Sequence, residues 1–144
     1  MRDIGSVIQG RHLTTLVIYS FPLLRSGVRS VLEEHYGSDM CVLDAANLRR
    51  ATLLLRERGD PPVDLVMCGP RVRNCGTDAA GLRRMCPDAV FCLLRDGGPD
   101  DAASLVRHMD AKGCIDPGMS EDELVAEVGR LLGVESRGID VARA

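Results

Sequence analysis

The sequence lacks long apolar runs, an excess of charge of one sign, and the layout of a secretion signal. No apolar run approaches the roughly 18 residues that a membrane-spanning helix needs. The first residues, MRDIGSVIQGRH, show no charged segment followed by an apolar one. The net charge of −3 is small and mixes both signs, so no overall field attracts nucleic acid or a membrane surface. We therefore expect a cytoplasmic protein that does not contact a membrane.

The six cysteines lack the spacing of a metal site, because no two of them form a Cys-x-x-Cys pair. Cys41, Cys68 and Cys92 lie inside apolar, strand-like runs, where cysteine usually behaves as a small buried hydrophobic residue. The three histidines fall in different predicted elements and share no local spacing. We expect reduced thiols and neither a metal nor a cofactor. A redox pair formed by Cys68 and Cys75 is the alternative.

What the sequence does contain is an alternation of two patterns along 144 residues, the length of about one domain. Short apolar runs predict strands at residues 13–18, 39–46, 63–68, 89–94 and 113–115. Helical periodicity predicts helices at residues 22–35, 47–59, 77–86, 99–111 and 120–133. Such alternation predicts an α/β fold with a parallel sheet covered by helices on both faces.

Helix-boundary signals support these assignments. Asn47 is a plausible N-cap, Gly59 a helix stop, and Ser120 with Glu123 has the spacing of a capping box. We divide the chain into an N-terminal extension (1–12), one domain (13–133) and a tail or start of a linker (134–144). In folds of this class the ligand site lies beyond the carboxyl ends of the strands.

Three stretches carry a resemblance to a known family: YSFPLLRSGVRSVLE (19–33), VDLVMC (63–68) and GCIDPGMSEDEL (113–124). In order and spacing they resemble bacterial response-regulator receiver domains of the NarL/LuxR type. The similarity covers residues 13–133. It implies a CheY-like (flavodoxin-like) three-layer sandwich with five parallel strands and five helices, and a role in two-component signal transduction and transcription regulation.

The positions that carry receiver chemistry hold other residue types here. They are Tyr19 and Ser20 for the acidic metal pair, Gly69 (or Cys68 after a shift of one) for the phosphoacceptor aspartate, Leu94 or Arg95 for the switch hydroxyl, and Pro117 for the lysine. None supplies a carboxylate to Mg²⁺, a phosphoryl acceptor or a charge clamp. The resemblance therefore implies a degenerate, atypical receiver that is not phosphorylated in the usual way. Asp44 and Asp116 are the nearest remaining carboxylates. We interpret both as loop or capping acids, and a salvaged metal site is the alternative.

Arginines replace the missing acids on the loops after the third and fourth strands. Arg71, Arg73 and Arg95 would reach the same edge of the sheet, where guanidinium groups could bind an anion such as a nucleotide or a phosphometabolite. The alternative is that these arginines are simply solvated. Tyr19 would either fill the vacated cavity, which we favour, or stack on a ligand.

We expect a regulatory module without enzymatic activity, because no paired nucleophile and base is visible. It would act by homodimerisation or by docking on a protein partner, and would reach DNA only through a helix-turn-helix domain outside this chain. Packing would use the first and last helices, or the fourth helix, fifth strand and fifth helix with Leu105, Met109 and residues 124–132. Sensing of an anionic ligand and a cysteine redox switch are the alternative functions.

Overall fold

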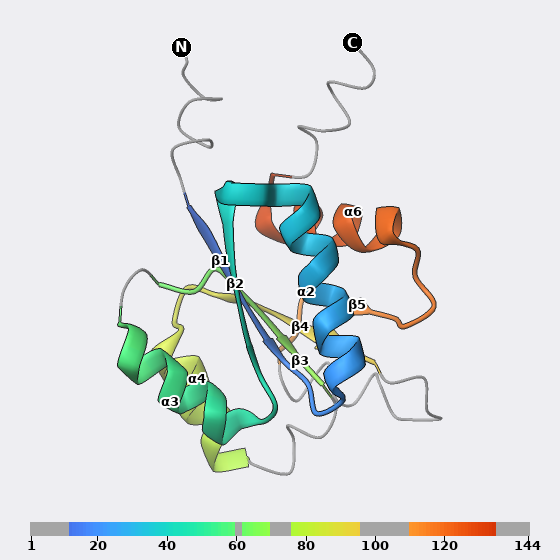
Figure 1. Cartoon of the computed structure of the whole chain (residues 1–144). Coiled ribbons are helices and arrows are strands. Elements are labelled where there is room, and N and C mark those ends of the chain that lie inside the picture. The colour runs from blue at the N-terminus through green and yellow to red at the C-terminus, as the bar shows by residue number, and fades with distance from the viewer. Residues whose placement is uncertain (1–11, 60–61, 70–75, 96–109, 135–144) are drawn as a thin grey trace, which may run out of the picture.

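The computed structural model describes residues 12–59, 62–69, 76–95 and 110–134. Its centre is a parallel five-stranded sheet in the order β2-β1-β3-β4-β5 (Figure 1). The strands are β1 (Leu13–Ile18), β2 (Met40–Ala45), β3 (Leu65–Cys68), β4 (Val90–Leu94) and β5 (Gly113–Ile115). All five predicted strands are confirmed, although β2, β3 and β4 begin one or two residues later than the apolar runs suggest.

Helices cover both faces of this sheet. On one face lie α2 (Pro22–Tyr36), which a 3-10 turn (η1, Gly37–Asp39) connects to β2, and α6 (Glu121–Leu132); on the other lie α3 (Leu48–Arg58) and α4 (Gly76–Met85) (Figure 1). The predicted α/β three-layer sandwich is therefore confirmed. None of the helices in the described part of the chain is long and apolar enough to cross a membrane.

The predicted helix at 99–111 lies almost wholly outside the described residues. Its last two residues are described, and there the prediction is wrong: Asp110 lies in a turn with φ 55°, and Ala111 is not helical. A left-handed backbone at Asp110 cannot continue a right-handed helix. The side chains of residues 76–80, at the start of α4, are also not described.

Two apolar cores form because successive strand residues point to opposite faces of the sheet. In β1, Leu16 and Ile18 pack toward α3 and α4, while Val17 packs toward α2 and α6. The central strands β1 and β3, and β4 apart from its first residue, are buried on both faces, as expected for a parallel sheet covered by helices. This alternation also fixes which residues just beyond the strands share a side.

The capping signals predicted at Asn47, Gly59 and Ser120 are confirmed. The Asn47 side chain accepts a hydrogen bond from the Arg50 backbone N–H (2.9 Å), which starts α3. Gly59 ends α3 with φ 74°, a conformation that glycine adopts without strain. Ser120 and Glu123 form a reciprocal capping box at the start of α6, with hydrogen bonds of 2.8 and 3.1 Å.

Candidate functional site at the carboxyl edge of the sheet

Tyr19 and Gly69 lie side by side just beyond the carboxyl ends of β1 and β3. The two strands pair with Ile18 opposite Cys68, and the Gly69 N–H donates to the Ile18 carbonyl (2.9 Å). A Cβ atom built on Gly69 would lie 2.5 Å from Cδ1 and 2.9 Å from Cε1 of Tyr19. The tyrosine ring therefore fills the space that a side chain at position 69 would need.

The Tyr19 ring is fixed in this position from several directions. Its exposed fraction is 4%, and its hydroxyl donates to the Arg95 carbonyl (3.4 Å). Its edge packs against Phe21, with ring centroids 5.6 Å apart. The Tyr19 N–H donates to the Ala45 carbonyl (3.1 Å), so the backbone is tied to β2 as well. A ring buried in this way is part of the core.

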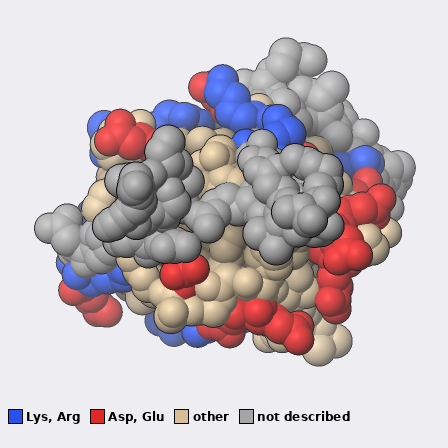
Figure 2. Space-filling view, turned by 90° about the horizontal axis from the view of Figure 1, so that it is seen from above, with Lys and Arg blue, Asp and Glu red and all other residues tan. Residues whose placement is uncertain are grey.

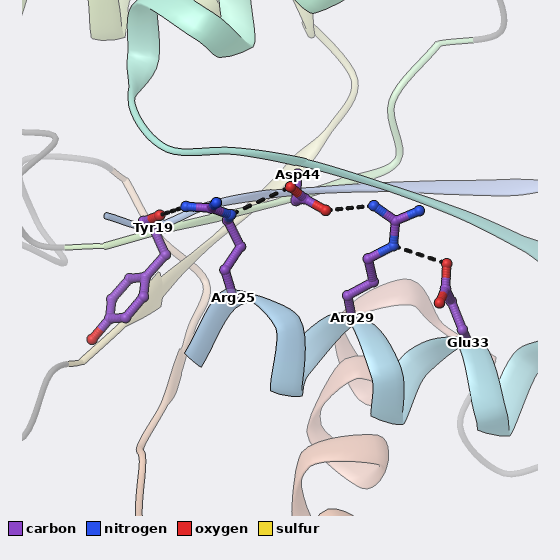
Figure 3. A network of polar contacts seen from close by, with 5 residues as sticks. All are labelled: Tyr19, Arg25, Arg29, Glu33 and Asp44. Carbon is purple, nitrogen blue, oxygen red and sulfur yellow. Dashed lines mark hydrogen bonds and ion pairs between the residues drawn. The ribbon is translucent and has the colours of Figure 1, made fainter. Parts of the chain in front are cut away.

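Asp44, near the end of β2, is held between two arginines of α2 (Figure 3). Arg25 Nε lies 3.3 Å from Asp44 Oδ1, and Arg29 Nη1 donates to Asp44 Oδ2. Arg25 also donates to the Tyr19 carbonyl (2.7 Å), and Arg29 to Glu33 (2.9 Å). The hydrogen bonds that Arg29 donates to Asp44 and Glu33 raise the pKa of Arg29. Asp44 is thus the acceptor of an arginine network, in a strand and not in a loop or a cap.

A second ion pair joins the ends of β4 and β5. Arg95 Nη1 lies 3.2 Å from Asp116 Oδ2, and the Arg95 N–H donates to the Ile115 carbonyl (2.8 Å). The only member of the predicted arginine group that the structure describes is therefore engaged with a carboxylate. Arg71 and Arg73 lie outside the described residues, so the anion site stays a prediction.

The donor set at this edge does not fit Mg²⁺. Magnesium in proteins is bound through one or two carboxylates, whereas Tyr19 is buried under its own hydrogen bonds and Ser20 carries only a hydroxyl. Asp44 already accepts from two guanidinium groups. Pro117, at the lysine position, is exposed and has no charge. Within the described ranges, no group of three or more His, Cys, Asp or Glu side chains could hold a metal ion.

Cys68, one half of the predicted redox pair, is fully buried at the end of β3. Burial raises its pKa to about 12, so the thiol stays protonated near neutral pH. The thiolate is the reactive form in thiol–disulfide exchange, and it is scarce here. Cys75 lies outside the described residues, so their pairing remains a prediction.

Next to Tyr19, an apolar cavity of about 200 Å³ opens between α2 and α6. We call it the α2–α6 groove. Leu24, Val28 and Val31 of α2 line one wall, and Leu124 of α6 lines the opposite wall. Tyr19, Leu94, Ile115 and the Arg95–Asp116 ion pair also border the groove. It lies on the same side of the sheet as the Tyr19 ring.

Neither the arginine network around Asp44 nor the α2–α6 groove was predicted from the sequence. A signal for the network was present: Arg25 and Arg29 are four residues apart on the first helix, and Asp44 lies near the end of the neighbouring strand. Residues with that spacing share a helix face. The groove had no such signal, because its volume depends on how α2 and α6 pack.

No model of a protein family matches the chain, and no curated protein matches it. Solved structures do. A LuxR family DNA-binding response regulator from Silicibacter pomeroyi is 22% identical (TM-score 0.66; 85% of this chain, 93% of that one). A response regulator from Thermotoga maritima is 20% identical (TM-score 0.69; 85% and 98%). The complex of the P1 domain of CheA3 with CheY6 from R. sphaeroides gives 18% identity (TM-score 0.70; 86% and 99%). The chain therefore has the fold of response-regulator receiver domains.

Proposed function

We propose that this chain is a receiver-like signalling module that is not phosphorylated on aspartate and acts by pairing or docking. The observation that carries the proposal is the Tyr19 ring, which occupies the space above Gly69 at the end of β3. The side chain of an aspartate at position 69 would need that space. Glycine has no side chain that could accept a phosphoryl group. The module has a fixed surface in place of a phosphorylation site.

The charges at the carboxyl edge support the same proposal. Phosphoryl transfer to a receiver requires carboxylates that hold a metal ion and a basic group that stabilises the transferred phosphoryl. Here Asp44 is neutralised by Arg25 and Arg29, and Asp116 by Arg95. We propose that the module has no catalytic role of its own and that it transmits a signal by association alone.

The surface around the α2–α6 groove is the part of the described chain best suited to pairing. Three large apolar side chains near the start of α2 are exposed: Leu23 at 87%, Phe21 at 44% and Leu24 at 38%. Leu24 also lines the groove. An apolar projection beside an apolar cavity is self-complementary, as a two-fold dimer requires. We propose that two copies pair through this surface.

The output of the module would lie in other polypeptide segments or partners. One similar structure is a LuxR family DNA-binding response regulator, and another is a complex of two signalling proteins. We propose that this chain regulates transcription together with a helix-turn-helix domain outside residues 1–144, or by docking on a protein partner.

Thermal unfolding with beryllofluoride and Mg²⁺ tests the absence of phosphoacceptor chemistry. A ligand at about 100 times its dissociation constant adds about 2.7 kcal/mol, which shifts the unfolding midpoint of a domain of this size by several degrees. We expect no shift for this chain, and a clear shift for a phosphorylatable receiver measured in parallel. A shift of several degrees in this chain would overturn the proposal.

A further inference from the structure

The two helical layers of the molecule carry charges of opposite sign. On α3 and α4 the described side chains include six arginines: Arg49, Arg50, Arg56, Arg58, Arg83 and Arg84. The only described acidic side chain on these two helices is Glu57. On the opposite layer, α6 carries four acids and one arginine. The chain is therefore electrically two-sided, although its net charge is only −3.

This separation is visible at the molecular surface. Most of the Asp and Glu side chains in Figure 2 gather toward the right and the lower edge of the view, and Lys and Arg side chains lie along the upper edge and at the left. The turn between the two views leaves left and right unchanged, and α3 and α4 lie at the left in Figure 1. In Figure 1, α6 lies at the upper right and α3 and α4 at the lower left, so the two helices that carry the arginines lie away from the acidic helix.

Among the described residues, two of the six arginines have side-chain contacts within the fold. Arg58 donates to Cys41 Sγ (3.9 Å), and the Arg83 guanidinium stacks 4.0 Å from the centre of the Phe91 ring. The others, Arg49, Arg50, Arg56 and Arg84, are exposed. Within the described part of the chain their side chains form no ion pair, so their charge is uncompensated.

Helix electrostatics explain only some of these positions. Basic residues in the last turn, such as Arg56 and Arg84, are favourable because they face the negative end of the helix dipole. Arg49 and Arg50 lie in the first turn of α3, where positive charge is unfavourable, and no acidic residue accompanies them there. The stability of α3 therefore does not account for this pair.

Apolar side chains interrupt the arginines. Arg49, Leu53 and Arg56 follow one another at i, i+4 and i+7, which places them on one face of α3. Leu53 is 44% exposed, and Met85, next to Arg84 on the neighbouring helix, is 38% exposed. We call Arg49, Arg50, Leu53, Arg56, Arg84 and Met85 the basic face.

We propose that the basic face docks an acidic segment of a partner protein that also presents apolar side chains. Carboxylates would pair with the exposed guanidinium groups, and an apolar residue would cover Leu53. A nucleic acid fits less well, because the described part of this face has no aromatic side chain on which bases could stack. Phosphate groups would also leave the apolar side chains of Leu53 and Met85 without an apolar partner. This proposal concerns the layer opposite the α2–α6 groove and does not rest on the proposed function.

The test is a binding titration of the whole chain at low salt with three labelled probes: an acidic amphipathic helical peptide of Glu and Leu, polyglutamate of equal length, and single-stranded DNA. The triple variant Arg49→Gln, Arg56→Gln, Arg84→Gln removes three charges from the face. A matched control, Ser26→Glu, Ser30→Glu, Ala126→Glu, changes the net charge equally at exposed positions of α2 and α6. Thermal unfolding confirms that both variants are folded.

We expect the amphipathic peptide to bind most tightly of the three probes. In the triple variant, the dissociation constant for this peptide should rise by about tenfold or more. The matched control should weaken binding far less. Leu53→Gln should weaken the binding of the amphipathic peptide but leave the binding of polyglutamate unchanged. The proposal is overturned if no acidic probe binds, if the triple variant binds like the control, or if DNA binds more tightly than the peptide.

Discussion

At the scale of single residues, the site is defined by one buried ring. Tyr19 is at once a core residue, a hydrogen-bond donor to the Arg95 carbonyl and the neighbour that excludes a side chain from Gly69. Because protein interiors are close-packed, such a contact makes the two positions interdependent. Substitutions at positions 19 and 69 should therefore not be additive.

Gly69→Ala is expected to destabilise the fold by about 1 to 3 kcal/mol, because the added methyl group overlaps the Tyr19 ring. In a Tyr19→Ala background the same change should have a much smaller effect, since the space is then empty. Urea unfolding of the four proteins in this double-mutant cycle gives the coupling free energy. Equal effects of Gly69→Ala in the two backgrounds would contradict the contact.

Asp44→Asn should destabilise the fold by about 0.5 to 1.5 kcal/mol, a range reduced for the partial exposure of Arg25 and Arg29. The reason is that both guanidinium groups lose their shared charged acceptor while remaining partly buried. Glu33→Gln is the matched control, because it removes only one exposed, same-helix partner of Arg29. Denaturant unfolding should show a clearly smaller effect for Glu33→Gln, and equal effects would mean that Asp44 does not tie α2 to β2.

Buried thiols should make the fold less stable in alkali. Burial raises the pKa of Cys68 to about 12 and that of Cys86 to about 11, above the ordinary value of about 8.5. The unfolded chain loses these protons first, so the stabilisation is complete only below the ordinary pKa of about 8.5 and declines as the pH rises from there toward 11 and 12. In urea unfolding at pH 7, 9 and 10.5, the free energy of unfolding of Cys68→Ala should decline less steeply with pH than that of the unmodified chain. Parallel declines would rule out this contribution of Cys68.

At the scale of elements, most of the fold was predictable because local patterns and tertiary packing agree. The five strands followed from apolar runs, and α3 and α6 were bounded by Asn47, Gly59 and Ser120 as their cap chemistry indicates. The exceptions have physical causes. Asp110 was assigned to a helix on periodicity alone, which does not reveal its left-handed backbone. Asp44 was interpreted as a loop or capping acid, and local patterns do not reveal its arginine partners because these come from another element.

The capping box is the element-level feature with the most direct consequence for the site, because it fixes the start of α6 beside the groove. Ser120→Ala is expected to destabilise the fold by about 1 kcal/mol, since the Glu123 backbone N–H loses its acceptor. Ser30→Ala, at an exposed position inside α2, should change stability little. Thermal unfolding of both variants checks this, and an equal effect at the two serines would show that the cap is not stabilising.

At the scale of the whole molecule, the two layers have different surfaces: an apolar groove with exposed leucines on one, and arginines with Leu53 on the other. We expect Leu23→Glu to weaken self-association by about tenfold or more, because a charge would have to be buried at an apolar contact. Stability should change by less than about 0.5 kcal/mol, since Leu23 is almost fully exposed. Leu53→Glu, on the other layer, is the control and should leave self-association unchanged.

The most direct test of a dimer that forms independently of phosphorylation is sedimentation equilibrium of the chain. It is measured over a wide concentration range, with and without beryllofluoride and Mg²⁺. We predict a monomer–dimer equilibrium whose dissociation constant is the same in both conditions. The reason is that Tyr19 occupies the space above Gly69 whether or not the phosphoryl mimic is present. A monomer at every concentration, or a dissociation constant that falls on addition of beryllofluoride and Mg²⁺, would contradict it.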